Sequence, residues 1–283
     1  MSDHSHIIHQ IQEARSRIKE AQRQGLRVGV VPTMGALHEG HLSLIDTSEE
    51  ECDRTVVWIF VNPTQFAPTE DLEKYPRTLQ ADTAAVGSRG AWFVFAPEVS
   101  TIYPAGFSTF VEPPSVAGRW EGEFRPTHFR GVSTVVLKLL QILPADRAYF
   151  GEKDFQQLQV IRAMANDFHL PTEIIGCPIV RDVDGLALSS RNQYLSSDER
   201  KRALALSSCL QETRALFDAG ERSVAALESR MKRILEPSVD RIDYAVVVDA
   251  VTLDPIREVH APAVALIAAY VGSTRLIDNC QLP

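Results

Sequence analysis

The 283-residue sequence has few cysteines, no long apolar segment and a deficit of positive charge. Its four cysteines (Cys52, Cys177, Cys209 and Cys280) lie far apart and form no C-x-x-C pair. They predict idle thiols in a reducing compartment and exclude a disulfide framework. The net charge of −8 argues against a general attraction to nucleic acid or anionic membranes. Any polyanion must therefore be bound at a small local site.

Membrane insertion and secretion are also not indicated. No apolar run reaches the roughly 18 residues that a membrane span needs. Residues 1–10 are polar and lack the apolar core of a signal peptide. His4, His6 and His9 in this segment could bind a metal, but a frayed polar terminus explains them more simply. We predict a cytoplasmic protein with no membrane or nucleic-acid partner and no metal bound by the protein alone.

Short apolar runs typical of strands alternate with segments of helical periodicity through the first two thirds of the chain. Strands are expected at residues 26–31, 55–61, 91–96, 147–150 and 172–177, and helices at 7–24, 42–51, 78–89, 131–143 and 155–168. This alternation predicts a parallel sheet with right-handed crossovers, and the apolar strands predict cover on both faces. The fold class is therefore α/β, a Rossmann-like doubly wound parallel sheet, which binds ligands beyond the carboxyl ends of its strands.

The pattern changes after Pro178. Two helices (197–220 and 223–235) precede two strands (244–248 and 263–271), which predicts a smaller C-terminal α+β domain. We place the Rossmann-like domain at residues 1–180 and the smaller domain, a candidate lid, at 181–283.

The first candidate site follows the first long strand, in P-T-M-G-A-L-H-E-G-H (residues 32–41). Glycines 35 and 40 would let the backbone approach a ligand, and a helix beginning near Gly40 would turn unpaired N–H groups towards a phosphate. His38 and His41, three residues apart, can share one face and donate to phosphate oxygens. Two surface histidines beside a glycine turn are the alternative. The H-x-G-H pattern resembles the signature of the nucleotidylyltransferase superfamily, whose enzymes attack the α-phosphate of ATP.

The second candidate site is F-V-N-P-T-Q-F (60–66), where Pro63 would end a strand and present Asn62 and Gln65 as neutral amides. Neutral amides can orient a carboxylate without weakening it as a nucleophile, as a bound cation would. The alternative is a plain Asn-Pro turn.

Two further segments carry cations beside small polar residues. In G-E-K-D-F-Q-Q (151–157), Lys153 suits a phosphate, Asp154 could cap a helix or accept from a ribose hydroxyl, and Gln157 would face the same opening as Gln65. In A-L-S-S-R-N (187–192), two hydroxyls and Arg191 could clamp a triphosphate. A capping turn and a serine-rich loop are the alternatives.

Taken together, these motifs resemble the pantothenate synthetase family. The resemblance also includes E-D-L-E-K-Y-P-R-T (70–78), R-P-T-H-F-R-G-V (125–132), V-V-L-K-L-L-Q (135–141) and D-G-L-A-L-S-S-R-N (184–192), and it spans roughly residues 26–195. Two departures are the large Trp58, which we expect to be repacked without loss of activity, and the stretch 115–124, which leaves the roles of Arg119 and Arg125 open.

The resemblance implies an ATP-dependent ligase that activates pantoate as an acyl-adenylate and joins it to β-alanine, releasing AMP and pyrophosphate. Mg²⁺ would accompany the triphosphate, and the protein would be a cytoplasmic homodimer in coenzyme A biosynthesis. The catalytic residues would be His41, His38 and Lys153, with pantoate and β-alanine held by Gln65, Gln157 and Asn62. The implied ATP contacts are Met34, Gly35, Ala36, Leu37, His38, Glu39, Gly40, His41, Gly151, Glu152, Lys153, Asp154, Val180, Leu188, Ser189, Ser190 and Arg191.

Three other functions remain open from the sequence. A cytidylyl- or adenylyltransferase of the same superfamily would release pyrophosphate without joining an amine. An RNA-charging enzyme is disfavoured because the chain is short and acidic. A nucleotide-binding sensor would bind ATP without pantoate-dependent release of AMP.

Overall fold

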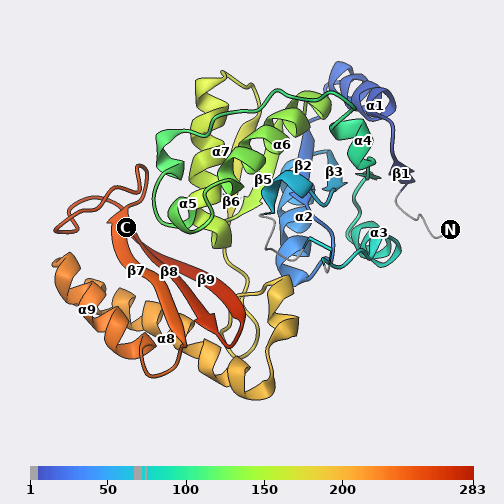
Figure 1. Cartoon of the computed structure of the whole chain (residues 1–283). Coiled ribbons are helices and arrows are strands. Elements are labelled where there is room, and N and C mark those ends of the chain that lie inside the picture. The colour runs from blue at the N-terminus through green and yellow to red at the C-terminus, as the bar shows by residue number, and fades with distance from the viewer. Residues whose placement is uncertain (1–5, 67–71, 74) are drawn as a thin grey trace. The chain divides into compact units, whose positions relative to one another are not determined.

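A six-stranded parallel sheet forms the centre of the first part of the chain in a computed structural model, which describes residues 6–66, 72–73 and 75–283 (Figure 1). Its strands, in the spatial order β1-β4-β3-β2-β5-β6, are β1 (His6–Ile8), β4 (Phe93–Phe95), β3 (Arg54–Ile59), β2 (Val28–Thr33), β5 (Arg147–Gly151) and β6 (Glu173–Cys177). The order reverses direction at β2, which pairs with both β3 and β5. This is the Rossmann-like order that the sequence predicts.

Helices lie on both faces of this sheet, as a doubly wound fold requires. Helices α2 (Glu39–Glu51) and α3 (Leu79–Ser88) pack together on one face, and α1 (Ile11–Arg23) packs against α6 (His128–Ile142). The remaining helices before β6 are α4 (Val99–Ile102), α5 (Glu121–Phe124) and α7 (Phe155–Asp167), with 3₁₀ turns η1 (Pro63–Gln65), η2 (Ser115–Ala117) and η3 (Glu152–Asp154). Alternate strand residues such as Val31, Val57 and Val94 are buried against α2 and α3. The expected fold class is confirmed.

The chain divides into two compact units, which are described separately. The first contains residues up to Glu152 together with Val160–Pro178, and the second contains Lys153–Gln159 together with Ile179–Pro283. The start of α7 therefore groups with the second unit. The domain limits 1–180 and 181–283 stay a prediction.

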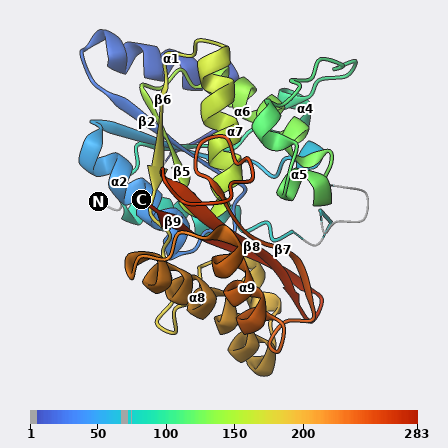
Figure 2. The same cartoon turned by 90° about the vertical axis from the view of Figure 1, so that its left-hand side faces the viewer.

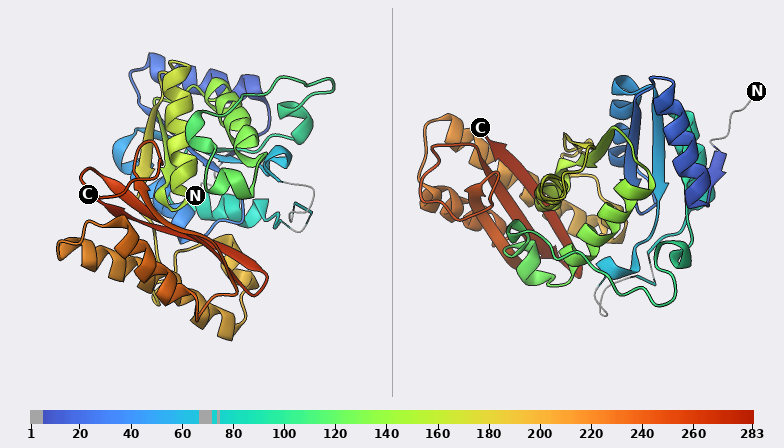
Figure 3. Two further views of the ribbon diagram at one scale, coloured as in Figure 1. Left: turned by 60° about the vertical axis from the view of Figure 1, so that its left-hand side comes forward. Right: turned by 90° about the horizontal axis from the view of Figure 1, so that it is seen from above.

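The second unit has a three-stranded antiparallel sheet covered on one face by two helices (Figures 2 and 3). Its strands β7 (Arg241–Asp249), β8 (Ala263–Val271) and β9 (Thr274–Leu282) lie in that order, and its helices are α8 (Ser197–Asp218) and α9 (Val224–Leu235), preceded by the 3₁₀ turn η4 (Ser190–Tyr194). Ser196 caps α8 by accepting from the Glu199 N–H, and Glu199 returns the bond in a capping box.

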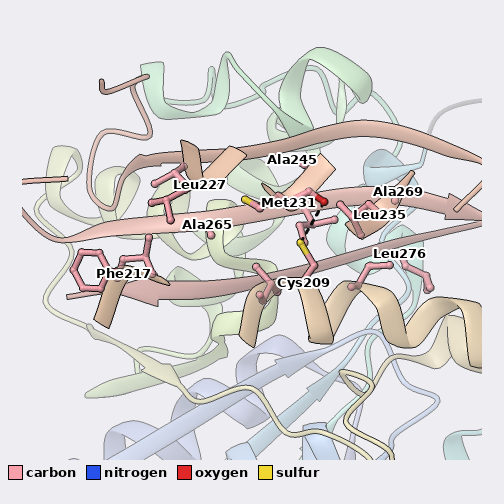
Figure 4. Packing of buried hydrophobic residues seen from close by; sticks show 14 of the residues in the cluster. Cys209, Phe217, Leu227, Met231, Leu235, Ala245, Ala265, Ala269 and Leu276 are labelled. Carbon is pink, nitrogen blue, oxygen red and sulfur yellow. Dashed lines mark hydrogen bonds between the residues drawn. The ribbon is translucent and has the colours of Figure 1, made fainter. Parts of the chain in front are cut away.

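An apolar core joins these helices to the sheet (Figure 4). Leu227, Met231 and Leu235 of α9 recur every fourth residue, so they share one face and meet the small residues Ala245 and Ala265 of the strands. Cys209 lies in this core with its thiol 3.6 Å from the Met231 carbonyl oxygen. The unit thus has its own core.

Two predictions of secondary structure are wrong. The helix expected from Ile7 begins only at Ile11, because residues 6–8 form β1 and pair with β4. Strand β9 is absent from the expected elements, although it pairs with β8 along its whole length. In contrast, Trp58 packs as expected: it is 3% exposed, and its ring lies 5.7 Å from Phe60 and 5.8 Å from Phe95.

Candidate functional site

The sheet order brings three of the predicted loops of the first unit to one edge. Because β2 pairs in parallel with β3 and with β5, the carboxyl ends of all three strands are neighbours. Loop 34–41 follows β2, the turn with Asn62 and Gln65 follows β3, and Gly151 and Glu152 end β5. This edge is the switch point where Rossmann-like sheets bind ligands.

His38 and His41 lie side by side at the start of α2, with ring centroids 4.0 Å apart and ring planes tilted by 33°. His38 is the N-cap residue: its Nδ1 accepts from the Gly40 N–H at 3.2 Å, and His41 Nδ1 accepts from the His38 N–H at 3.4 Å. A ring nitrogen that accepts carries no proton, so each neutral ring is protonated on Nε2. Both histidines therefore have Nε2–H as a donor, which suits phosphate oxygens.

A buried carboxylate on α3 holds the same loop. Asp82 is 4% exposed, and it accepts from the Ala36 N–H at 3.0 Å, the Leu37 N–H at 2.9 Å and the Thr78 hydroxyl at 3.0 Å. Ala36 has a left-handed φ of 52°, which is costly for a residue with a Cβ and needs support of this kind. Asp82 is not among the residues that the sequence motifs predict, because it lies in a segment expected only to be a helix.

These bonds correct one expectation about the loop. The sequence predicts unpaired N–H groups facing a phosphate, but the amides of residues 35–38, 40 and 41 all donate within the protein. Glu39 is exposed, and its carboxylate pairs with Arg89 at 2.7 Å. The candidate donors of this loop to a ligand are therefore side chains, chiefly the two imidazoles.

Asn62 is buried, which corrects the expectation that its amide is presented at the sheet edge. It is 1% exposed, and its Nδ2 donates to Gln65 Oε1 at 2.9 Å and to the Gly131 carbonyl oxygen at 3.3 Å. Its Oδ1 accepts from the Thr64 N–H and hydroxyl and from the Tyr103 hydroxyl. Burial raises the pKa of Tyr103 above its usual value, so the phenol stays a donor.

This network fixes the orientation of the Gln65 amide. A backbone N–H can only donate, so the Asn62 atom facing Thr64 N is the oxygen, and the atom facing Gln65 is the NH₂. Gln65 must then offer its oxygen to Asn62. Its Nε2, with two N–H groups, is directed elsewhere and is suited to donate to a carboxylate or hydroxyl.

The backbone of Gln65 is held from the other side by residues whose roles the sequence left open. The Gln65 carbonyl oxygen accepts from Arg125 Nη2 at 3.3 Å and from His128 Nδ1 at 3.2 Å. Arg125 in turn pairs with the buried Glu121. The backbone of α6 touches this turn so closely that a Cβ on Gly131 would lie 2.2 Å from the Thr64 oxygen. Gln65 is thus positioned from several sides.

The second unit carries the remaining predicted residues. Lys153 and Asp154 lie in η3 and Gln157 in the first turns of α7. The Lys153 carbonyl oxygen accepts from Asn279 Nδ2 at 3.0 Å. The hairpin 180–188 brings Val180 and Leu188 together, since the Leu188 N–H donates to the Val180 oxygen at 3.0 Å.

Ser189 begins the next turn as the N-cap of η4, where its hydroxyl accepts from the Arg191 N–H at 3.3 Å. The serines and Arg191 therefore follow directly on an ordered hairpin. The contacts of these residues with ATP, and those of the first-unit residues with ATP or pantoate, stay a prediction.

Within the part of the chain that the structure describes, no group of three or more His, Cys, Asp or Glu residues could hold a metal ion. His4 lies outside the described residues, as do Glu70, Asp71 and Lys74 of the motif at 70–78. None of the described helices is long and apolar enough to cross a membrane. All four cysteines are free thiols, as expected.

Comparison with known proteins gives a consistent result. The sequence model of the family described as "Pantoate-beta-alanine ligase" matches residues 6–281. The pantothenate synthetase of Rhodopirellula baltica is 52% identical over 275 residues, covering 96% of this chain and 97% of that protein. Pantothenate synthetase 1 of Bradyrhizobium diazoefficiens is 52% identical over 280 residues, covering 98% of each chain.

Solved structures agree. The pantothenate synthetase of Thermus thermophilus superposes with a TM-score of 0.93 at 42% identity, covering 98% of this chain and 99% of that one. The pantoate–β-alanine ligase of Francisella tularensis, solved with β-γ ATP and β-alanine, has a TM-score of 0.79 at 35% identity, covering 98% and 97% of the two chains. The chain therefore belongs to the pantoate–β-alanine ligase family, also named pantothenate synthetase.

Proposed function

We propose that this protein condenses pantoate with β-alanine to give pantothenate, through a pantoyl-adenylate intermediate and with release of AMP and pyrophosphate. Family membership supports the overall reaction. One observation carries the proposal for the site: imidazole side chains after β2 and an oriented amide donor after β3 lie at adjoining strand ends. Donors for a polyphosphate and for a carboxylate are what the first step requires.

In that first step, a pantoate carboxylate oxygen bonds to the α-phosphorus of ATP while the bond to pyrophosphate breaks. Gln65 and Gln157 would hold pantoate through neutral amides, which leaves the attacking oxygen nucleophilic. Negative charge grows on the departing pyrophosphate. His38, His41 and Lys153 would stabilise it, with Ser189, Ser190 and Arg191 contacting the same triphosphate.

In the second step, the β-alanine amine attacks the activated carbonyl carbon and loses a proton, and AMP leaves with the bonding electron pair. A free carboxylate cannot do this, because its oxide is a poor leaving group. Holding both reactants in place can contribute roughly 7–11 kcal/mol to lowering the barrier. The second unit would close as a lid and keep water from the mixed anhydride.

Mg²⁺ fits as a companion of the nucleotide. The described residues form no cage of acidic side chains, and Mg²⁺ in such enzymes commonly keeps waters and binds substrate phosphates. When bound, it would neutralise triphosphate charge. The proposal also includes a cytoplasmic homodimer that serves coenzyme A synthesis.

The test is AMP release with each substrate omitted in turn. The proposal predicts ATP–pyrophosphate exchange that requires pantoate, and AMP release that requires pantoate and is accelerated by β-alanine. Lys153→Ala and His41→Ala should each lose about 2.7–4 kcal/mol of barrier stabilisation, roughly 10²–10³-fold in rate. The melting temperature should stay unchanged in Lys153→Ala and should fall in His41→Ala, which also loses the capping bond from the His38 N–H. Exchange without pantoate would instead indicate a nucleotidylyltransferase, and ATP binding without AMP release would indicate a sensor.

A further inference from the structure

Strand β9 carries two buried polar residues side by side. Asp278 is 3% and Asn279 is 4% exposed, between the core residues Leu276 and Leu282 of the same strand. Burying a carboxylate and an amide costs free energy unless both are fully hydrogen-bonded. The hydrogen-bond partners of Asp278 and Asn279 therefore indicate which segments these residues hold in place.

Asp278 holds the hairpin 180–188. Its two carboxylate oxygens accept from Arg181 Nη1 at 2.7 Å and Nη2 at 3.0 Å, a bidentate pair of fixed geometry. Arg181 also donates to the Gly185 oxygen at 3.2 Å, which ties the hairpin strand to its turn. The hairpin ends at Leu188, directly before the serines and Arg191.

The outer end of this hairpin is fixed independently. Arg200 of α8 pairs with Asp182 at 2.6 Å and with Asp184 at 2.8 Å. These bonds are partly exposed and individually weak, so the pair with the buried Asp278 is the stronger constraint on the hairpin.

Asn279 holds a second segment on the opposite face of the strand. Consecutive strand residues point to opposite faces, and Asn279 Nδ2 donates to the Lys153 carbonyl oxygen at 3.0 Å. Lys153 lies in the short turn η3, between β5 and α7. One strand therefore contacts two segments, 126 and 97 residues away along the chain, that carry the cations predicted to bind the triphosphate.

We propose that Asp278 and Asn279 are positioning residues for ATP, which set the places of Lys153 and of the loop beginning at Leu188. The inference rests on the proposed function, since it assigns these cations to the triphosphate. Neither residue need touch ATP. A cation displaced by about 1 Å from its working position can cost on the order of 10²-fold in rate.

The experiment compares Asn279→Asp and Asn279→Ala with the control Leu276→Val in the full-length enzyme. Asn279→Asp keeps the shape but has no donor for the Lys153 oxygen. Leu276→Val removes one methylene from the core on the same strand, and this side chain makes no hydrogen bond to either segment. Melting temperature, kcat/KM for ATP in pantoate-dependent AMP release, and the discharge of preformed pantoyl adenylate by β-alanine are measured for each variant.

Both Asn279 variants should lower kcat/KM for ATP by roughly 10–100-fold while adenylate discharge changes less than about threefold. Leu276→Val should lower the melting temperature and leave both steps near wild type. Asp278→Asn should likewise lower kcat/KM for ATP far more than it slows adenylate discharge.

Wild-type ATP kinetics in Asn279→Asp would overturn the inference, as would equal losses in both steps. If Asp278→Asn changed both steps equally or neither step, Asp278 would not be a positioning residue. Absence of pantoate-dependent AMP release in the unsubstituted enzyme would overturn the proposed function, and the inference with it.

Discussion

Gly131 gives the sharpest test of how the Gln65 amide is positioned. It lies inside α6, where the helix backbone meets the turn η1. A Cβ at this position would lie 2.2 Å from the Thr64 oxygen and 2.9 Å from the Gln65 nitrogen. Both contacts are with backbone, which cannot rotate away as a flexible side chain can. Gly131→Ala must therefore push η1 away from α6 by about 0.8 Å or more.

The expected effects on stability and on activity differ in size. Alanine favours the helix by roughly 0.5–1 kcal/mol, whereas overpacking costs about 1–3 kcal/mol, so the net loss of unfolding free energy should be about 0–2.5 kcal/mol. A shift near 1 Å at a substrate-holding group can reduce the rate about 10²-fold. Activity should therefore fall far more than stability.

The assay is steady-state kinetics with pantoate and ATP varied separately. We expect kcat/KM for pantoate to fall about 100-fold while KM for ATP changes little, because Asp82 of α3 holds the loop with His38 and His41. Gly118→Ala is the control: its backbone is helical, and its nearest new contact is 3.3 Å. A Gly131→Ala enzyme with wild-type efficiency for pantoate would refute this account of Gln65.

Three further predictions concern the loop, the core and the thiols. Asp82→Asn should raise KM for ATP about tenfold, because only one of the two side-chain atoms of an amide can accept a hydrogen bond from a backbone N–H. Thr83→Val is the control and should leave KM for ATP unchanged, since the Thr83 hydroxyl on the same helix donates to the Leu79 oxygen. Equal KM values for ATP in the two variants would contradict the role of Asp82. Trp58→Ala should cost about 3–5 kcal/mol in urea unfolding, and a loss under about 1 kcal/mol would show that the ring is not part of the core. Burial raises the pKa of Cys177 to about 11 and that of Cys209 to about 12, so both thiols should resist alkylation at pH 8 until the chain is unfolded, and rapid labelling of the folded protein would contradict this burial. Because thiols in the unfolded chain ionise at a lower pH, the free energy of unfolding should fall as pH rises from about 9 towards those values.

The central sheet could be read from the sequence because its strands are apolar on both faces. Strands β2, β3 and β5 are nearly continuous runs of buried residues, and Pro32 and Gly151 mark the ends of β2 and β5. Strand β1 could not be read, because Ile7 and Ile8 continue the helical spacing of α1 and only pairing with β4 decides otherwise. Strand β9 was missed because Asp278 and Asn279 interrupt its apolar pattern, and their burial depends on partners distant in the sequence.

The same distinction applies to the candidate site. His38, His41 and Gln65 stand in short local motifs, so their proximity to strand ends could be predicted. The residues that hold them could not be predicted, because Asp82 and Gly131 act through backbone groups far along the chain. A buried aspartate in a helix has no local signature that separates it from a solvated one.

The engagement of the amides in loop 34–41 has a consequence for how this scaffold can change over evolution. A nucleotide cradle made of main-chain N–H groups is insensitive to most single substitutions, since every residue type except proline supplies the same donor. Here those donors are committed to Asp82, Thr33 and the histidine rings. Under the proposed function, binding of the polyphosphate would therefore depend on side chains, so altering which phosphate chain is accepted would require only point mutations on an unchanged backbone.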